Sequence, residues 1–285
     1  MAKEPKLDRL SPALAILGTR KDLCVRLAST REEIVTAQRL RYRVFYEELK
    51  ANPISASSQS RLDADRFDEF CDHLLVVHHV PKGADGHFMV DDGEMVGTYR
   101  LLRQSVAEKN GGFYTQSEFD IAPLLALKPT LKFLELGRSC VLKQYRTKPV
   151  VELLWQGIWN YVRQHRLDVM LGCASLDGTD QRVHGTTLNF LAHNCAAPPE
   201  WRVRALPERY IEMKTNAENV ADTKTALKAL PPLIKGYLRL GCYIGEGAVI
   251  DRQFNTTDVL IILPVSKINA RYFSHFGKPD DAITG

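Results

Sequence analysis

The hydrophobic pattern along the chain alternates between two periods. Short apolar runs bounded by polar or glycine-containing segments predict buried strands, whereas apolar positions that recur every three to four residues predict amphipathic helices. Strands are expected at 23–27, 73–80, 87–90, 95–103, 131–142, 169–174, 201–206 and 258–265. Helices are expected at 31–49, 113–127, 149–166, 179–194 and 233–240, with a last helical period at Ile268, Tyr272 and Phe276.

The order strand, helix, strand over 131–174 sets the fold class. Two strands joined by a helix of this length lie parallel, with the helix crossing one face of the sheet. The expected architecture is therefore α/β, with a mixed central sheet flanked by helices. Residues 1–20 mix Pro, Lys and Ala without a sustained period and predict a flexible arm, so 21–285 is expected to form one domain with an extended C-terminal part. The polar segment 51–60 is expected to be a mobile loop that could cover a site.

One predicted strand, 131–142, carries two charges within an apolar run. Glu135 and Arg138 flank Gly137, and charged residues rarely become buried unless they are paired or used. On a regular strand the two side chains would face opposite sides, but an extra residue bulged at Gly137 would bring them to one face and splay the neighbouring strand. A splayed central strand makes a cleft. The alternative is a structural ion pair.

Composition narrows the class of protein and its location. The chain has 285 residues, of which 45% are hydrophobic and 25% charged, as in a soluble globular protein. No apolar run approaches the ~20 residues that cross a bilayer, and the N-terminus lacks a signal-peptide core, so a cytoplasmic location is expected. The six cysteines form no CxxC pair, which indicates neither disulfides nor a metal site. A net charge of +4 suits an acidic protein partner or an anionic membrane surface better than nucleic acid.

Five spaced motifs occur in the order of a known family. They are Arg41-Tyr42-Arg43-Val44-Phe45, the pair Asp65 and Asp68, Gly97-Thr98-Tyr99-Arg100-Leu101-Leu102, Phe119, and Glu135-Leu136-Gly137-Arg138. This order resembles the acyl-homoserine-lactone synthases of the GNAT-like N-acyltransferase superfamily, which implies a GNAT-like fold with splayed parallel strands. Those synthases carry a Trp soon after the helix Phe, near their S-adenosylmethionine site. Here Glu47, Glu48 and Leu49 occupy that region.

The C-terminal part resembles a related family. The stretch Leu230–Val265, with Arg271-Tyr272 and His275-Phe276-Gly277, is similar to the ornithine-lipid acyltransferases, also called hemolysin-like. The resemblance implies transfer of a (3-hydroxy)acyl group from acyl carrier protein to the α-amine of L-ornithine, giving lyso-ornithine lipid. It implies no cofactor beyond the phosphopantetheine thioester of the donor. An acyl-homoserine-lactone synthase, an N-acyltransferase for another amino acid and a non-catalytic binding module remain alternatives.

The chemistry of amide formation suggests roles for the charged residues. An ammonium must lose a proton before it attacks a thioester, and Glu135 is the best candidate to take it. Burial would raise the pKa of Glu135, and Arg138 would oppose that shift. Arg138 or Arg100 could hold the substrate carboxylate, and N–H groups freed by a bulge near Gly137 or Cys140 could stabilise the oxyanion.

Further substrate contacts follow from the resemblance and from charge. The family motifs place Arg41, Phe45 and Phe119 at the substrate site. Asp65 and Asp68 could bind the δ-ammonium of ornithine if they share one face. In the alternative, they cap a helical turn or pair with arginines of the first helix. Cys140 is expected to pack in the core rather than to form an acyl-enzyme.

A basic loop precedes the helix at Pro149. Lys143, Gln144, Arg146 and Lys148 lie where free N–H groups and the helix dipole favour anions. The loop lacks the glycines with which acetyl-CoA users of the superfamily bind pyrophosphate. A single phosphopantetheine phosphate and an acidic carrier protein remain plausible ligands, and a solvated loop without a ligand is the alternative. The amphipathic segment 233–243 could touch the inner face of the membrane or face the core.

Overall fold

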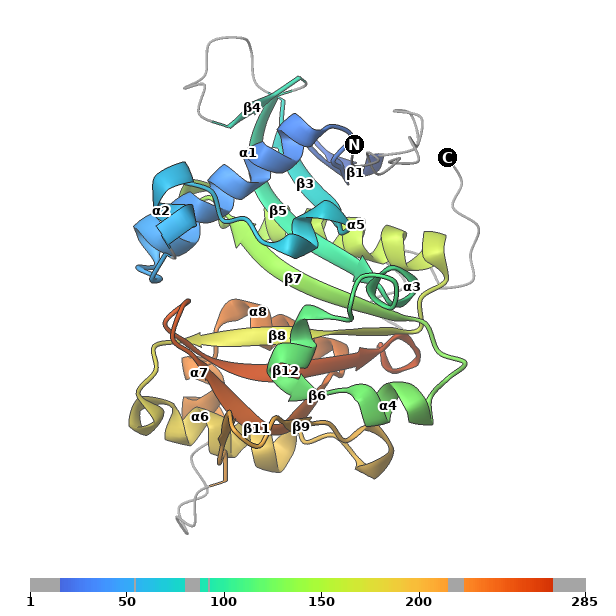
Figure 1. The fold of residues 1–285 in the computed structure, drawn as a ribbon, viewed down its shortest axis with the longest axis vertical. Coiled ribbons are helices and arrows are strands. Elements are labelled where there is room, and N and C mark those ends of the chain that lie inside the picture. The colour runs from blue at the N-terminus through green and yellow to red at the C-terminus, as the bar shows by residue number, and fades with distance from the viewer. Residues whose placement is uncertain (1–15, 54, 80–87, 92, 215–222, 269–285) are drawn as a thin grey trace.

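The computed structural model describes residues 16–53, 55–79, 88–91, 93–214 and 223–268, and the outer ends of the chain lie outside this part. Its centre is one mixed β-sheet with the strand order β1-β2-β3-β5-β7-β8-β12-β11-β9-β6, to which β4 is added beside β5 and β10 beside β11 (Figure 1). The fold is of the GNAT-like α/β type that the sequence predicts. Helices lie on both faces of the sheet.

The elements follow one another with short connections. The strands are β1 (Ile16–Arg20), β2 (Leu23–Leu27), β3 (Asp72–His78), β4 (Met89–Val90), β5 (Gly93–Arg103), β6 (Phe119–Asp120), β7 (Phe133–Val141), β8 (Val169–Asp177), β9 (Arg204–Ala205), β10 (Tyr210–Ile211), β11 (Tyr243–Asp251) and β12 (Thr256–Pro264). The α-helices are α1 (Arg31–Tyr42), α2 (Ser55–Ser60), α3 (Gln104–Ala107), α4 (Ala122–Leu127), α5 (Lys148–His165), α6 (Gln181–Asn194), α7 (Thr223–Ala229) and α8 (Pro232–Leu240). A π-helical turn, Arg43–Glu48, continues α1, and 3₁₀ turns occur at Arg66–Glu69, Tyr114–Ser117, Lys143–Tyr145, Pro199–Trp201 and Val265–Lys267.

The parallel pair β7 and β8 separates part of the way along. Their register runs from Phe133 opposite Val169 to Glu135 opposite Leu171, although β7 continues to Val141 and β8 to Asp177. The strands touch most closely where they part. A Cβ atom on Gly172 would lie 2.3 Å from the backbone oxygen of Leu136, so only glycine fits at this junction. The splayed strands predicted from the sequence are confirmed.

A bulge on β7 controls where Arg138 points. Thr98 of β5 is opposite Cys140 and Arg100 is opposite Gly137, so Arg138 and Ser139 together face Tyr99 alone. Arg138 has a φ of 51°, a left-handed conformation that is uncommon for a residue with a side chain and that often marks a functional site. The sequence placed the extra residue at Gly137, and the structure places it immediately after.

Both faces of the sheet are covered, which explains the continuous apolar runs of its strands. On β3, Leu74 and Val76 belong to the cluster that contains the apolar face of α5, whereas Leu75 and Val77 pack with Leu40 of α1. Because the side chains of β3 alternate between faces, α1 and α5 lie on opposite sides (Figure 1). β3 is therefore held between the two helices.

Four predicted segments differ from the structure. Residues 16–20, assigned to the flexible arm, form β1 antiparallel to β2. The polar segment 51–60 contains the helix α2 rather than loop alone. The helix expected over 113–127 is divided into a 3₁₀ turn, β6 and α4, because Glu135 holds the backbone of the first turn and Phe119 pairs with Ala205. Only Arg204–Ala205 of the strand expected at 201–206 is extended.

The C-terminal third contains a strand that the sequence did not predict. β11, at Tyr243–Asp251, pairs with β12 and includes Gly247 with a φ of 83°, where the register shifts. The glycines and Glu246 interrupt the apolar pattern, which hid the strand. The helical period at Tyr272 and Phe276 lies outside the described residues.

The helix α8 is part of the core. Ile234, Tyr237 and Leu240 are buried against β12 and α5, so the apolar face of this amphipathic helix is occupied. Within the described residues, each helix is either too short or too polar to cross a bilayer.

Candidate active site

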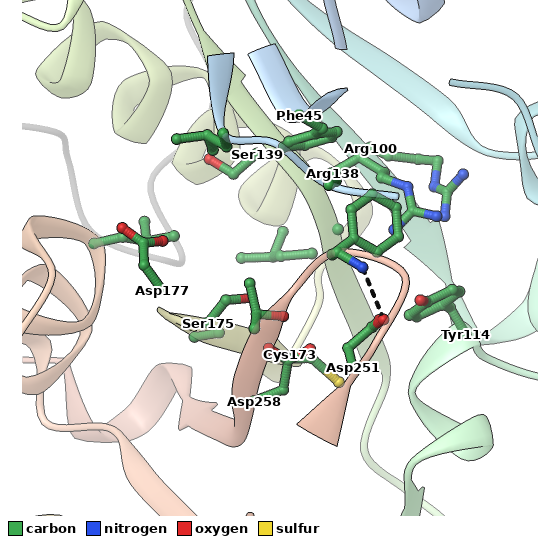
Figure 2. A pocket seen from close by; sticks show the side chains of 18 of the residues that line it. Phe45, Arg100, Tyr114, Arg138, Ser139, Cys173, Ser175, Asp177, Asp251 and Asp258 are labelled. Carbon is green, nitrogen blue, oxygen red and sulfur yellow. Dashed lines mark hydrogen bonds between the residues drawn. The ribbon is translucent and has the colours of Figure 1, made fainter. Parts of the chain in front are cut away.

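A cavity of about 450 Å³ opens where β7 and β8 separate (Figure 2). Its walls come from both splayed strands, from the π-helical turn after α1 and from the hairpin that joins β11 to β12. The lining includes Phe45, Glu48, Arg100, Tyr114, Glu135, Arg138, Ser139, Cys173, Ser175, Asp177, Asp251, Phe254 and Asp258.

The residues predicted to bind substrate divide into two groups. Phe45 and Arg100 line the cavity together with the predicted catalytic pair. Arg41, Asp65, Asp68 and Phe119 are not among the lining residues. Phe119 is fully buried in the apolar cluster around β6 and β12.

Glu135 faces the cavity and also holds a neighbouring turn. Its two carboxylate oxygens accept the backbone N–H groups of Tyr114 at 3.0 Å and Thr115 at 2.6 Å. Burial raises the pKa of Glu135 above its ordinary value, and the hydrogen bonds from Thr115 and Tyr114 and the charge of Arg100 oppose the rise. The carboxyl group is thus fixed in orientation and is easier to protonate than an exposed glutamate.

Arg138 reaches the same cavity from the bulge. Its Nη2 donates to Asp65 Oδ2 at 3.1 Å, its Nε lies 3.3 Å from Asp63, and its guanidinium stacks over the rings of Tyr114 and Phe254. Burial alone would lower the pKa of Arg138, but the nearby carboxylates of Asp63 and Asp65 raise it above its ordinary value, so the guanidinium stays charged. The bulge therefore brings Glu135 and Arg138 to one side of the sheet.

A buried ion-pair network lies behind the cavity and supports Arg138 and Arg100. Arg41 donates to Asp63 and Asp68, and Arg100 donates to Asp65 at 2.6 Å and to Asp68 at 3.2 Å. Burial alone would raise the pKa of Asp68, but Arg41 and Arg100 hold it well below its ordinary value.

The same network settles how the predicted pair Asp65 and Asp68 is engaged. The two residues form a capping box at the 3₁₀ turn and pair with arginines, as in the alternative considered from the sequence. The partners are Arg41, Arg100 and Arg138, whereas Arg43 stacks over Phe88. Asp63, which the sequence analysis did not single out, joins them.

The basic loop lies at the rim of the cavity. Arg146 makes a two-fold contact with Glu48, itself a lining residue, at 2.5 and 2.9 Å. Lys143, Gln144 and Lys148 are exposed, and Thr147 caps α5 without a side-chain hydrogen bond. Pro149 has no N–H group and the N–H of Val151 donates to the backbone oxygen of Thr147, so the N–H groups of Lys148 and Val150 are the ones left for an anion within the described residues.

Three carboxylates that the sequence analysis did not combine form a cluster beside the cavity, next to β11 and β12. One oxygen from each of Glu118, Asp251 and Asp258 lies within 4.8 Å of the other two, and all three residues are buried. This is an acidic group of the kind that could hold a cation. In the sequence, Asp258 is the first residue of the predicted strand 258–265, directly before its apolar run.

Burial disfavours the thiolate form of two cysteines, Cys173 in the cavity wall and Cys140 farther along β7. Burial raises the pKa of the thiol of Cys140, and of Cys173, far above the ordinary value, so both stay protonated. Cys140 packs in the apolar cluster beneath α1, as expected.

Comparison with known proteins agrees with this geometry. A family profile described as "Acetyltransferase (GNAT) domain" matches residues 40–156. The chain is 49% identical to "L-ornithine N(alpha)-acyltransferase" of Agrobacterium fabrum, over 99% of this chain and 94% of that protein, and 50% identical to the protein of that name from Brucella abortus, over 92% and 91%. A solved structure, "FeeM, an N-acyl amino acid synthase from uncultured soil microbes", has a TM-score of 0.47 and 13% identity over 88% of this chain and 97% of its own.

The splayed strands and the matched profile define a GNAT-type acyltransferase. At this level of identity over nearly the whole chain, the protein belongs to the L-ornithine N(alpha)-acyltransferase family.

Proposed function

We propose that the protein transfers a (3-hydroxy)acyl group directly from acyl carrier protein to the α-amine of L-ornithine, giving lyso-ornithine lipid. One observation carries the proposal: Glu135 and Arg138 share a cavity between splayed strands, in a chain whose relatives are named for ornithine Nα-acylation. A base and a cation in one cleft suit an acceptor that has both an ammonium and a carboxylate.

Glu135 is the proposed proton acceptor. The α-amine attacks the thioester carbonyl carbon, the carbon–nitrogen bond forms, and the carbon–sulfur bond breaks. Of the two protons that the nitrogen loses, one protonates the departing thiolate and the other leaves to solvent through Glu135. Its raised pKa supports this role, because a base titrating nearer neutral pH both accepts and releases a proton readily.

Arg138 is the proposed partner of the acceptor's carboxylate. It is more accessible than Arg100, since 12% of its side chain is exposed against 4%, and its contact with Asp65 is longer, at 3.1 Å against 2.6 Å. The backbone N–H groups at Arg138 and Ser139, displaced from regular pairing by the bulge, are the proposed donors to the oxyanion.

The donor is proposed to enter past the basic loop. The open start of α5 and the cations Lys143, Arg146 and Lys148 suit the phosphate of phosphopantetheine and the acidic surface of a carrier protein. Gln144 could add a hydrogen bond there. Contact with the cytoplasmic face of the membrane stays a prediction, to which α8 contributes no free apolar face.

A thiol-release assay tests the proposal. Purified protein with 3-hydroxyacyl carrier protein and ornithine should release free carrier thiol and form a product with the mass of N-acylornithine. Turnover that depends on S-adenosylmethionine would instead indicate an acyl-homoserine-lactone synthase, and turnover with a different amino acid would reassign the acceptor. Salt-sensitive binding of carrier protein without any turnover would indicate a non-catalytic module.

A further inference from the structure

The acidic cluster Glu118, Asp251 and Asp258 comes from three separate elements. Glu118 ends the 3₁₀ turn before β6, Asp251 ends β11, and Asp258 lies inside β12. Glu118 is 1% exposed and Asp258 5%. Three carboxylates so close together in a buried position repel one another strongly unless one binds a proton or a cation lies among them.

The described residues neutralise this cluster only in part. Arg209 lies 4.0 Å from Glu118 Oε1 and also donates to the backbone oxygen of Ser117. Asp251 Oδ1 accepts backbone N–H groups at the hairpin turn, one of them from Phe254 (Figure 2). Glu118 Oε2 and Asp258 Oδ1, both buried, have no hydrogen-bond partner within the described part of the chain. Two acceptor oxygens are therefore left for a ligand.

The cluster borders the acyl-transfer cavity. Asp251 and Asp258 line that cavity, with Cys173 and Ser175 of β8 beside them (Figure 2). Cys173 is near both the cluster and the proposed base, because Glu118, Asp258 and Glu135, together with burial, raise the pKa of its thiol. A short molecule in the cavity could place one end at Glu135 and the other at the cluster.

We propose that Glu118, Asp251 and Asp258 form the subsite for the side-chain ammonium of a diamino acid acceptor. The inference rests on the proposed function and names what selects ornithine over neutral amino acids. An ammonium brings three N–H donors and one positive charge to a place with two unpartnered oxygens. Asp65 and Asp68, the carboxylates first considered for this role, are already paired with arginines.

Electrostatics support the assignment. Burial raises the pKa of Glu118, and the neighbouring Asp258 raises it further. The pKa of Asp258 is likewise raised by burial and by Asp251. Arg209, Cys173, and the hydroxyl groups of Ser175 and Thr256 lower one or the other pKa without cancelling the rise. Without a bound acceptor, the three carboxylates therefore tend to hold a proton, and the ammonium of the acceptor replaces that proton when it binds.

The test compares two acceptors that differ only in the δ-amine. The specificity constant kcat/KM is measured for ornithine and for norvaline with wild-type enzyme and with the variants Asp258→Asn and Glu118→Gln. Removing one charge from a buried, hydrogen-bonded ion pair should lower the ornithine-over-norvaline preference about 30-fold or more. The loss should fall on ornithine more than on norvaline, which makes no contact with the subsite through a side-chain ammonium. Asp120→Asn, an exposed position close to Glu118 in sequence, serves as the matched control and should keep the wild-type preference.

The outcomes separate the two proposals. Wild-type enzyme that does not acylate ornithine overturns both of them. Wild-type enzyme that acylates ornithine, with the same preference in Asp258→Asn and Glu118→Gln, overturns the subsite alone. One equivalent of a divalent metal in the purified wild-type protein that Asp258→Asn lacks would assign the cluster to a metal instead. Circular dichroism of each variant checks that the fold is retained.

Discussion

The carboxylate of Glu135 accepts the backbone N–H of Thr115 at 2.6 Å, and both residues line the cavity. The proposed base is therefore also the anchor of the 3₁₀ turn Tyr114–Ser117, which ends beside Glu118. Catalytic and structural roles meet in one side chain. A substitution at Glu135 needs a readout that separates them.

Glu135→Gln places an amide NH₂ against backbone N–H donors, so both turnover and stability should fall. Loss of a general base lowers kcat about 100-fold or more. The separating measurement is the pH profile of kcat/KM for ornithine. In wild type it should fall as the pH drops through the raised pKa of Glu135, because the protonated carboxyl cannot accept a proton. A variant that keeps this acidic limb would exclude Glu135 as the base.

Arg41→Met tests the network behind the cavity. Arg41 is 1% exposed and compensates both Asp63 and Asp68, so its removal leaves two buried carboxylates short of a partner. The free energy of unfolding, measured by urea denaturation, should fall by about 3 kcal/mol or more. Arg43→Met, in the π-helical turn that continues α1, removes the contact of an exposed arginine with Phe88 and should cost less than about 1 kcal/mol. Equal effects would contradict the buried-network account.

Local patterns predicted the centre of the fold. The strand 131–142, the crossover helix and the return strand each show a clear apolar period, and the two charges of the first strand indicated the cleft. Such signals arise within a few residues, so they are readable before the chain is folded. The direction of Arg138 depended on a bulge, for which Gly137 was a visible but approximate marker.

The partners of those residues could not be predicted in the same way. Asp251 and Asp258 are brought together by the pairing of β11 with β12, and Glu118 joins them through the pairing of β6 with β9 and of β9 with β11. Asp258 also stood at the start of the predicted strand 258–265, where a charge is ordinary. In the structure β12 begins at Thr256, which moves Asp258 into the strand interior. The role of Asp63 could not be predicted either, because it follows from contacts with Arg41 and Arg138 that exist only in the folded chain.

Lys143→Glu tests donor entry. Reversing one charge beside the open start of α5 should raise the KM for acyl carrier protein about tenfold at low salt and less at high salt. The KM for ornithine should stay unchanged. Arg182→Glu, an exposed arginine on α6 that pairs with Asp180, is the matched control. If the two variants behave alike, the loop does not guide the carrier protein.

Gly172→Ala tests the point where the strands part. The new Cβ would lie 2.3 Å from the backbone oxygen of Leu136, so β7 and β8 must move apart at the mouth of the cavity. The free energy of unfolding, measured by thermal denaturation, should fall by about 1–3 kcal/mol, and kcat should also fall. Gly185→Ala in α6 is the control, because its Cβ meets nothing within 4 Å and alanine favours helix. An unaffected Gly172→Ala enzyme would show that the junction is not constrained.

Asp258→Asn should make the protein without acceptor more stable, increasingly so as the pH rises. The pKa of Asp258 is raised in the folded protein by burial and by Asp251, so the folded state binds more protons than the unfolded state above about pH 4. The stabilisation that comes from protonated Asp258 is lost as the pH rises through this window. The carboxylate of Asp258 then becomes charged close to Glu118, Asp251 and Cys173, and Arg209 compensates these charges only in part.

The asparagine variant does not acquire that charge, so its advantage over wild type should grow from near zero at pH 4.5 to roughly 2 kcal/mol at pH 8. Urea denaturation of both proteins across this range measures it, with Asp120→Asn expected to follow wild type at every pH. Saturating ornithine should reduce the difference at pH 8, because the bound ammonium stabilises wild type more than the variant. A difference that is constant with pH would mean that Asp258 does not titrate within the cluster.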